Sequence, residues 1–212
     1  MPFFRKINVL FIHIPKTGGT SIENYFYKKY NIDRTLSTLY SDMRMVFHKH
    51  SLQHSTYKEL YDNKEYFNIP FGKKLKIITV VRNPYERLIS DLFFFNLINT
   101  NTTPEEVTTV IKDYLYNDNS VVQYDNHPLP QTAFLINEYG SISENIHILR
   151  LENINQDMYE IGFKDFNICD NVTHKFQSNY FTFLTNESIG MINKFYKKDF
   201  KMLDYRKVKN KK

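Results

Sequence analysis

The sequence predicts a three-layer α/β/α domain built around a mainly parallel β-sheet. Three short apolar runs, 7–14, 75–82 and 146–151, have the length and the β-branched content of buried strands. The segments between these runs carry helix start signals and apolar residues at helical spacing. Strands that alternate with helices are typical of α/β folds with a parallel sheet.

The first predicted strand, 7–14, is stopped by Pro15 and by the pair Gly18-Gly19. A helix fits the residues that follow, 20–30, because their apolar positions recur every three or four residues. The chain therefore begins with a strand, a glycine turn and a helix.

The second predicted strand, 75–82, repeats this pattern. Asn83 suits the N-cap of a helix because its side-chain oxygen can accept from an amide of the first turn. Pro84 suits the first helical position, where no backbone donor is needed. We expect this helix to run to about residue 98.

Three further elements complete the prediction. Thr103 and Pro104, followed by two acids, start another helix by the same capping logic. Residues 146–151 form the third strand, and apolar residues at helical spacing predict one long terminal helix over 187–203.

The length of 212 residues fits one sizeable domain, and 42% hydrophobic residues suffice for a core. No repeat or Gly/Ser-rich linker divides the chain, so we expect one domain over 1–205 and a frayed basic tail over 206–212. The single cysteine, Cys169, excludes a disulfide-rich module. The apolar run 7–14 is too short for a membrane span and has no cleavage site, so neither an anchor nor a signal peptide is predicted.

Charge is divided along the chain. Residues 1–90 carry 15 Lys and Arg against 7 Asp and Glu, whereas residues 91–200 carry 7 against 15. Anion-binding chemistry is therefore expected in the first half of the chain. The excess of basic residues there surrounds one glycine turn, which argues against nucleic-acid binding as the function.

The glycine turn has the composition of an anion-binding loop. Two glycines let the backbone approach a ligand, the following helix presents its N-terminal amides, and neighbouring side chains add donors. The spacing differs from a Walker A loop, because the lysine precedes the glycines. The loop residues are Lys16, Thr17, Gly18, Gly19, Thr20 and Ser21.

This loop and the segment 81–90 together resemble the carbohydrate-type sulfotransferases that use 3'-phosphoadenosine 5'-phosphosulfate (PAPS), the family 2-like branch. The resemblance implies a P-loop NTPase-like sulfotransferase fold. It also implies that residues 16–21 hold the 5'-phosphosulfate, and that Arg82 and Ser90 hold the 3'-phosphate. Arg82 ends a predicted strand, where open α/β sheets bind ligands, and its planar fork suits a phosphate.

Other segments extend the resemblance or depart from it. Residues 131–135, 148–153 and 195–200 echo downstream blocks of the family. The region 174–178 departs from the family pattern, since Phe176 stands where members often have Asn. The role of that region stays open, as does that of Arg87, which is either a further phosphate ligand or the partner of a nearby acid.

Sulfuryl transfer to a hydroxyl needs a base for the acceptor proton and positive charge on the leaving phosphate. Lys16 is the candidate for the charge. The candidates for the base are His48, His50 and His54, and we prefer His54, because it precedes a capped helix start as a similar histidine does in the family. His50 stays an alternative.

The predicted function is therefore a PAPS-dependent sulfotransferase that acts on a hydroxyl of an acceptor, a carbohydrate, with no metal required. Two alternatives are a nucleotide-dependent phosphotransferase and a non-catalytic module that binds nucleotide or glycan. Family members of the Golgi carry an anchor, so its absence here predicts a soluble, cytoplasmic enzyme of a microbial or virus-infected cell. The sequence identifies neither the acceptor nor the oligomeric state.

Overall fold

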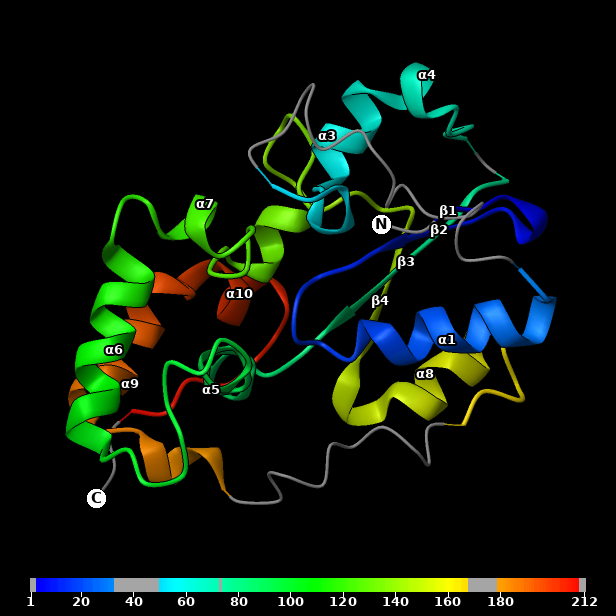
Figure 1. The fold of residues 1–212 in the computed structure, drawn as a ribbon. Helices are drawn as coiled ribbons and strands as arrows, with labels where there is room; N and C mark the ends of the chain where they lie inside the picture. The colour runs from blue at the N-terminus through cyan, green and yellow to red at the C-terminus, as the bar shows by residue number, and fades with distance from the viewer. Residues whose placement is uncertain (1–2, 33–49, 73, 168–178, 210–212) are drawn as a thin grey trace. The chain divides into compact units, whose positions relative to one another are not determined.

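The computed structural model describes residues 3–32, 50–72, 74–167 and 179–209 of the chain (Figure 1). It divides into two compact units. The first unit comprises Met1–Val81 and Ala133–Asn171, and the second comprises Arg82–Thr132 and Val172–Lys212. A single domain over 1–205 stays a prediction.

The first unit contains the sheet, whose strand order is β1-β2-β3-β4. Strands β2 (Val9–Ile12), β3 (Lys76–Val81) and β4 (Ile146–Arg150) pair in parallel, and β1 (Phe3–Phe4) adds one antiparallel edge. The predicted α/β class with a mainly parallel sheet is therefore confirmed. The first predicted strand is shorter than expected, because Asn8 adopts a left-handed conformation directly before β2.

Helices cover the sheet on both sides, as Figure 1 shows. Helices α1 (Gly19–Tyr30) and α8 (Ile154–Glu160) lie on one face, and α3 (Tyr57–Asp62) and α4 (Lys64–Phe67) lie on the other side. The core between the sheet and α1 contains Phe11, Phe26 and Ile78, none of which is exposed to solvent. Short 3-10 helices connect these elements: η1 (Arg5–Ile7), η3 (Leu52–His54), η4 (Gln131–Phe134) and η5 (Leu151–Asn153).

The second unit is helical and has its own core. It contains α5 (Pro84–Phe94), α6 (Pro104–Tyr116), α7 (Ser120–Gln123), η7 (Tyr180–Phe183), α9 (Asn186–Phe195) and α10 (Lys197–Met202). Buried apolar side chains of α5, α6 and α9, among them Leu92, Ile111 and Ile192, pack together. This packing stabilises helices such as α6, whose 13 residues would be marginal as an isolated helix.

The helix starts follow the predicted signals. The side chain of Asn83 accepts from the amide of Tyr85, and Pro84 is the first residue of α5. Three other helices begin with a reciprocal capping box, in which an N-cap threonine and the third helical residue bond to each other's backbone amides. The pairs are Thr56 with Glu59, Thr103 with Glu106, and Thr185 with Ser188.

Helix α5 ends at Phe94, before the predicted end at residue 98. Asn96 adopts a left-handed conformation with φ 55°. Its amide donates to the Phe93 carbonyl, and the amide of Leu97 donates to the Leu92 carbonyl. This is a Schellman motif, which satisfies the last carbonyls of a helix and turns the chain away.

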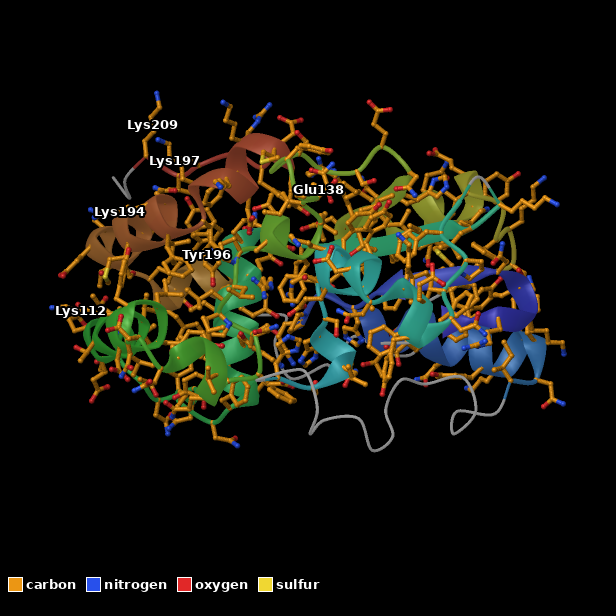
Figure 2. The ribbon with its side chains drawn as sticks, turned by 90° about the horizontal axis from the view of Figure 1, so that it is seen from above. Lys112, Glu138, Lys194, Tyr196, Lys197 and Lys209 are labelled. Carbon is orange, nitrogen blue, oxygen red and sulfur yellow. The ribbon has the colours of Figure 1, made fainter. Side chains whose placement is uncertain are left out.

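The single terminal helix predicted over 187–203 is wrong, because the structure has α9 and α10 with a break at Tyr196. The Tyr196 ring is buried and its hydroxyl donates to the Pro128 carbonyl at 3.1 Å. Lys194 and Lys197, on either side of the break, point outward (Figure 2). The break therefore turns one aromatic side chain inward without burying the lysines beside it.

The basic tail is attached further along the chain than expected. The amide of Val208 donates to the Tyr85 hydroxyl at 2.9 Å, and its carbonyl accepts from Asn193 at 2.9 Å. The chain is thus held as far as Val208, past the expected boundary at residue 206, and fraying beyond it stays a prediction. Within the described ranges, no helix is both long and apolar enough to cross a membrane.

Candidate active site

The predicted anion-binding loop joins β2 to α1 in the first unit. Lys16 has φ 63° and Gly18 has φ 85°, so two of its residues adopt left-handed backbone conformations. The buried Thr17 hydroxyl donates to the Ile14 carbonyl at 2.9 Å and braces the turn from inside. Lys16 is partly exposed and Thr20 is exposed. Such a turn before a helix N-terminus directs backbone amides to one side, which suits an anion.

Both glycines of the loop lie close to neighbouring side chains. A Cβ atom on Gly18 would lie 2.7 Å from Cδ1 of Leu151. A Cβ atom on Gly19 would lie 2.7 Å from Nε2 of His13. The side chains of Leu151 and His13 therefore pack tightly against the two glycines, and a residue larger than glycine does not fit at either position unless these side chains move.

The His13 imidazole, which packs against Gly19, is paired with a buried acid. Nδ1 of His13 lies 2.5 Å from Oε1 of Glu23, and both side chains are 7% exposed. Glu23 belongs to α1, so the pair ties the strand end to the helix that follows the loop. The position of His13 directly after β2 fits a role in supporting the loop.

The preferred base, His54, lies in the same unit and is 7% exposed. Its ring packs edge-on against the His13 ring, with 5.7 Å between the ring centroids. His54 ends the 3-10 helix η3, and the capping box of Thr56 with Glu59 follows two residues later. The structure thus brings His54 next to the residue that supports the loop.

The alternative base, His50, is engaged at both ring nitrogens. Nδ1 lies 2.8 Å from the Ser51 carbonyl, and Nε2 lies 2.9 Å from Oε1 of Glu59. Burial acts to raise the pKa of Glu59, but the hydrogen bonds from His50 and Thr56 outweigh burial and lower it to about 2. Both neighbours of the ring are therefore acceptors. A ring whose two nitrogens are both engaged within the protein is poorly placed to take a proton from an acceptor hydroxyl.

Arg82 begins the second unit and is held at both ends. Its amide donates to Oε1 of Gln131 and its carbonyl accepts from Nε2 of Gln131, each at 2.8 Å. Its guanidinium donates to the Tyr180 hydroxyl at 3.1 Å and to Glu86 at 3.3 Å. No local pattern indicates Tyr180, which lies 98 residues from Arg82, whereas Glu86 lies one helical turn after Arg82.

The two other residues of the segment 81–90 differ in exposure. Ser90 lies two turns into α5 and is half-buried. Arg87 is 2% exposed and donates to the carbonyls of His127 and Leu129 at 2.7 and 2.9 Å. These contacts tie Arg87 to the turn that follows α7, and its role as a further phosphate ligand stays a prediction.

A buried polar cluster lies one helical turn after Arg87 on α5. Asp91 accepts from the Tyr114 hydroxyl at 2.6 Å, and its second oxygen lies 2.6 Å from Nδ1 of His127. Burial and the neighbouring Asp91 raise the pKa of Tyr114. The cluster links α5, α6 and the turn after α7.

The candidate His48 and the region 174–178 lie outside the described residues, as does Cys169. Among the residues that the structure does describe, no group of three or more His, Cys, Asp or Glu side chains is placed to hold a metal ion.

The fold and the loop define a class of protein. A parallel sheet whose first parallel strand leads through a lysine-bearing glycine turn into a helix is typical of α/β proteins that bind phosphorylated or sulfated ligands. A scan against protein-family models matches the sulfotransferase family, family 2, over residues 3–206. The chain belongs to the sulfotransferase family, as the resemblance predicted, and this membership supports sulfotransfer as its activity. No curated protein and no solved structure gives a significant match.

Proposed function

We propose that this chain transfers a sulfuryl group from PAPS to a hydroxyl group of a carbohydrate acceptor. The observation that carries the proposal is the loop 16–21. It combines a lysine, two left-handed backbone positions and a helix N-terminus at the end of a parallel strand. Family membership supplies the reaction class, and the loop supplies a place for the sulfated end of the donor.

The residues of the loop fit the 5'-phosphosulfate of the donor. Gly18 and Gly19 carry no side chain that would cover the amides of the turn. Thr20 and Ser21 lie in the first turn of α1 and provide hydroxyl donors beside those amides, while the Thr17 hydroxyl serves the loop itself. Lys16 brings the positive charge, which stabilises the phosphate as it leaves with the bonding electrons.

Arg82 and Ser90 would hold the 3'-phosphate, which distinguishes PAPS from ATP. Arg82 directly follows β3, and a guanidinium can bond two phosphate oxygens at once. Its contacts with Tyr180 and Glu86 limit the orientations of the guanidinium. An arginine held in this way loses less conformational entropy on binding than a free one.

The reaction is a direct displacement at sulfur. The acceptor oxygen forms a bond to sulfur, the bond from sulfur to the 5'-phosphate oxygen breaks, and the acceptor proton goes to a base. We assign the base to His54, whose buried ring lies against the His13 ring. The two acceptors around His50 argue against that residue as the base. No residue needs a metal ion in this scheme.

The experiment that tests the proposal is calorimetric titration with 3'-phosphoadenosine 5'-phosphate (PAP), ADP and Mg-ATP. We expect PAP to bind best without metal, and Arg82→Ala to remove that preference. Arg206→Ala removes the same charge from an exposed position of the same unit and should bind PAP normally. Equal or better binding of Mg-ATP would instead favour a phosphotransferase.

A second measurement separates an enzyme from a binding module. Transfer of radioactive sulfate from PAPS to a panel of polysaccharides and small glycans is expected for the wild-type protein. Binding of PAP without transfer to any hydroxyl acceptor, including tyrosine peptides and lipids, would favour the non-catalytic module. Transfer to a non-carbohydrate acceptor alone would correct the acceptor class and leave the reaction unchanged.

A further inference from the structure

Gln131 makes an unusual pair of bonds with the backbone of one distant residue. The oxygen of its side-chain amide accepts from the backbone N–H of Arg82, and the nitrogen donates to the backbone carbonyl of Arg82. Both distances are 2.8 Å. The Gln131 side chain is completely buried. A primary amide that bonds both backbone groups of one residue imitates a neighbouring strand, so it fixes the main chain where β3 has just ended.

Gln131 is itself held by a buried acid. Asp199 accepts from the backbone N–H of Gln131 at 2.7 Å. It also accepts from the backbone N–H and the side-chain hydroxyl of Thr132, at 2.9 and 2.7 Å. Asp199 is 0% exposed, and burial raises its pKa although these hydrogen bonds oppose the shift. A buried carboxyl group is costly unless hydrogen bonds satisfy it. Here three hydrogen bonds satisfy it, and they fix the backbone of Gln131 and both the backbone and the side chain of Thr132.

The side chain of Arg82 is held at its far end as well. The guanidinium contacts the Tyr180 hydroxyl and lies over the Tyr180 ring at 5.2 Å from the centroid. The Arg82 side chain is 13% exposed. With the backbone fixed by Gln131 and the guanidinium fixed by Tyr180, only the short stem between them can move.

We infer that Gln131, oriented by Asp199, is a positioning residue for Arg82 and thereby sets the preference for a 3'-phosphate. This inference rests on the proposed function, in which Arg82 binds that phosphate. Gln131 acts through Arg82 and needs no contact with the donor. Its loss should weaken recognition of the 3'-phosphate while the rest of the nucleotide binds as before.

The test compares two nucleotides that differ only in that phosphate. PAP and 5'-AMP are titrated against the wild-type protein, Gln131→Met and Arg82→Ala. Gln131→Met has a similar length but can make neither bond to Arg82, so we expect PAP affinity to fall about 10-fold. The affinity for 5'-AMP should stay unchanged. Thr108→Val is the control, because it removes partly buried hydrogen bonds of the same unit, which join Thr108 to Pro104 and Thr185 and do not involve Arg82.

A double variant distinguishes positioning from general weakening. In the Arg82→Ala background, Gln131→Met should have no further effect on PAP affinity, because the group that it positions is gone. Equal losses for PAP and 5'-AMP in Gln131→Met would mean a merely structural role and would overturn the inference. If Gln131→Met does not fold, Gln131→Glu replaces it in the test, because a carboxylate still accepts from the Arg82 backbone N–H. Its PAP affinity should lie between that of the wild type and that of Arg82→Ala.

Failure of the inference is distinct from failure of the proposed function. A wild-type protein that binds PAP no better than 5'-AMP would remove the 3'-phosphate site itself. A wild-type protein that prefers PAP, loses the preference in Arg82→Ala and keeps it in Gln131→Met would leave the proposed function intact and refute the role of Gln131.

Discussion

Gly19 lies directly against the imidazole of His13, and a Cβ atom at this position would be 2.7 Å from Nε2. The ring cannot easily move aside, because its other nitrogen lies 2.5 Å from Glu23 in a buried pair. The second glycine of the loop is therefore required by packing. Gly18 is required for a different reason. A Cβ atom there would meet only the flexible end of the Leu151 side chain, but its φ of 85° disfavours any residue other than glycine.

Gly19→Ala should therefore destabilise the protein by about 1–3 kcal/mol, the usual cost of an added methyl group in a close-packed site. Any displacement of the His13 ring also moves the loop, so PAP affinity should fall as well. Urea unfolding and PAP titration measure the two effects. The control is Gly190→Ala in α9, where a Cβ meets nothing within 4 Å and alanine should raise stability by about 1 kcal/mol. Equal stability of Gly19→Ala and the wild type would show that the ring yields.

The choice between two histidines leads to a kinetic prediction. His54→Ala should lower kcat about 10²- to 10⁴-fold, the usual contribution of a general base, with PAP affinity unchanged. His50→Ala should lower stability and leave kcat within about 10-fold, because its ring is bonded to Ser51 and Glu59. Full activity of His54→Ala would remove the assignment of the base. A larger loss of kcat in His50→Ala than in His54→Ala would exchange the two roles.

The acid that binds His50 predicts a pH dependence of stability. The pKa of Glu59 is lowered from 4.5 to about 2, so its ionised form is favoured in the folded state. This contribution is fully present above pH 4.5 and is lost as the pH falls from 4.5 towards 2. Glu59→Gln should thus destabilise the protein at pH 7, by about 1 kcal/mol, and the difference should shrink below pH 4.5. Urea unfolding at pH 7, 4 and 2.5 measures it, and a constant difference would contradict the prediction.

The beginnings of helices could be predicted because their signals are local. Asn83, Pro84 and Thr103 act within their own first turn, and the structure shows the expected caps. The end of α5 was also encoded locally, by the left-handed Asn96, but an asparagine is a weaker signal than a glycine and was missed. The strands were recognised by composition, and the left-handed Asn8 then shortened the first one.

The contacts of Arg82 with Gln131 and Tyr180 could not be predicted, because both partners lie far along the chain. Gln131 is 49 residues away and Tyr180 is 98 residues away. Neither residue type is specific for such a contact, and only the fold brings them together. The break at Tyr196 has a similar origin. Helix propensity favours continuation there, whereas the buried ring and its bond to Pro128 depend on tertiary packing.

The three capping boxes have a consequence for the order of events in folding. Each box is complete within four consecutive residues, such as Thr103 to Glu106. A contact of such short range closes almost no loop, so it can form while the rest of the chain is still unfolded or being synthesised. The start of each helix is therefore selected early. The pairing of Arg82 with Gln131, which closes a loop of 49 residues, has to form later.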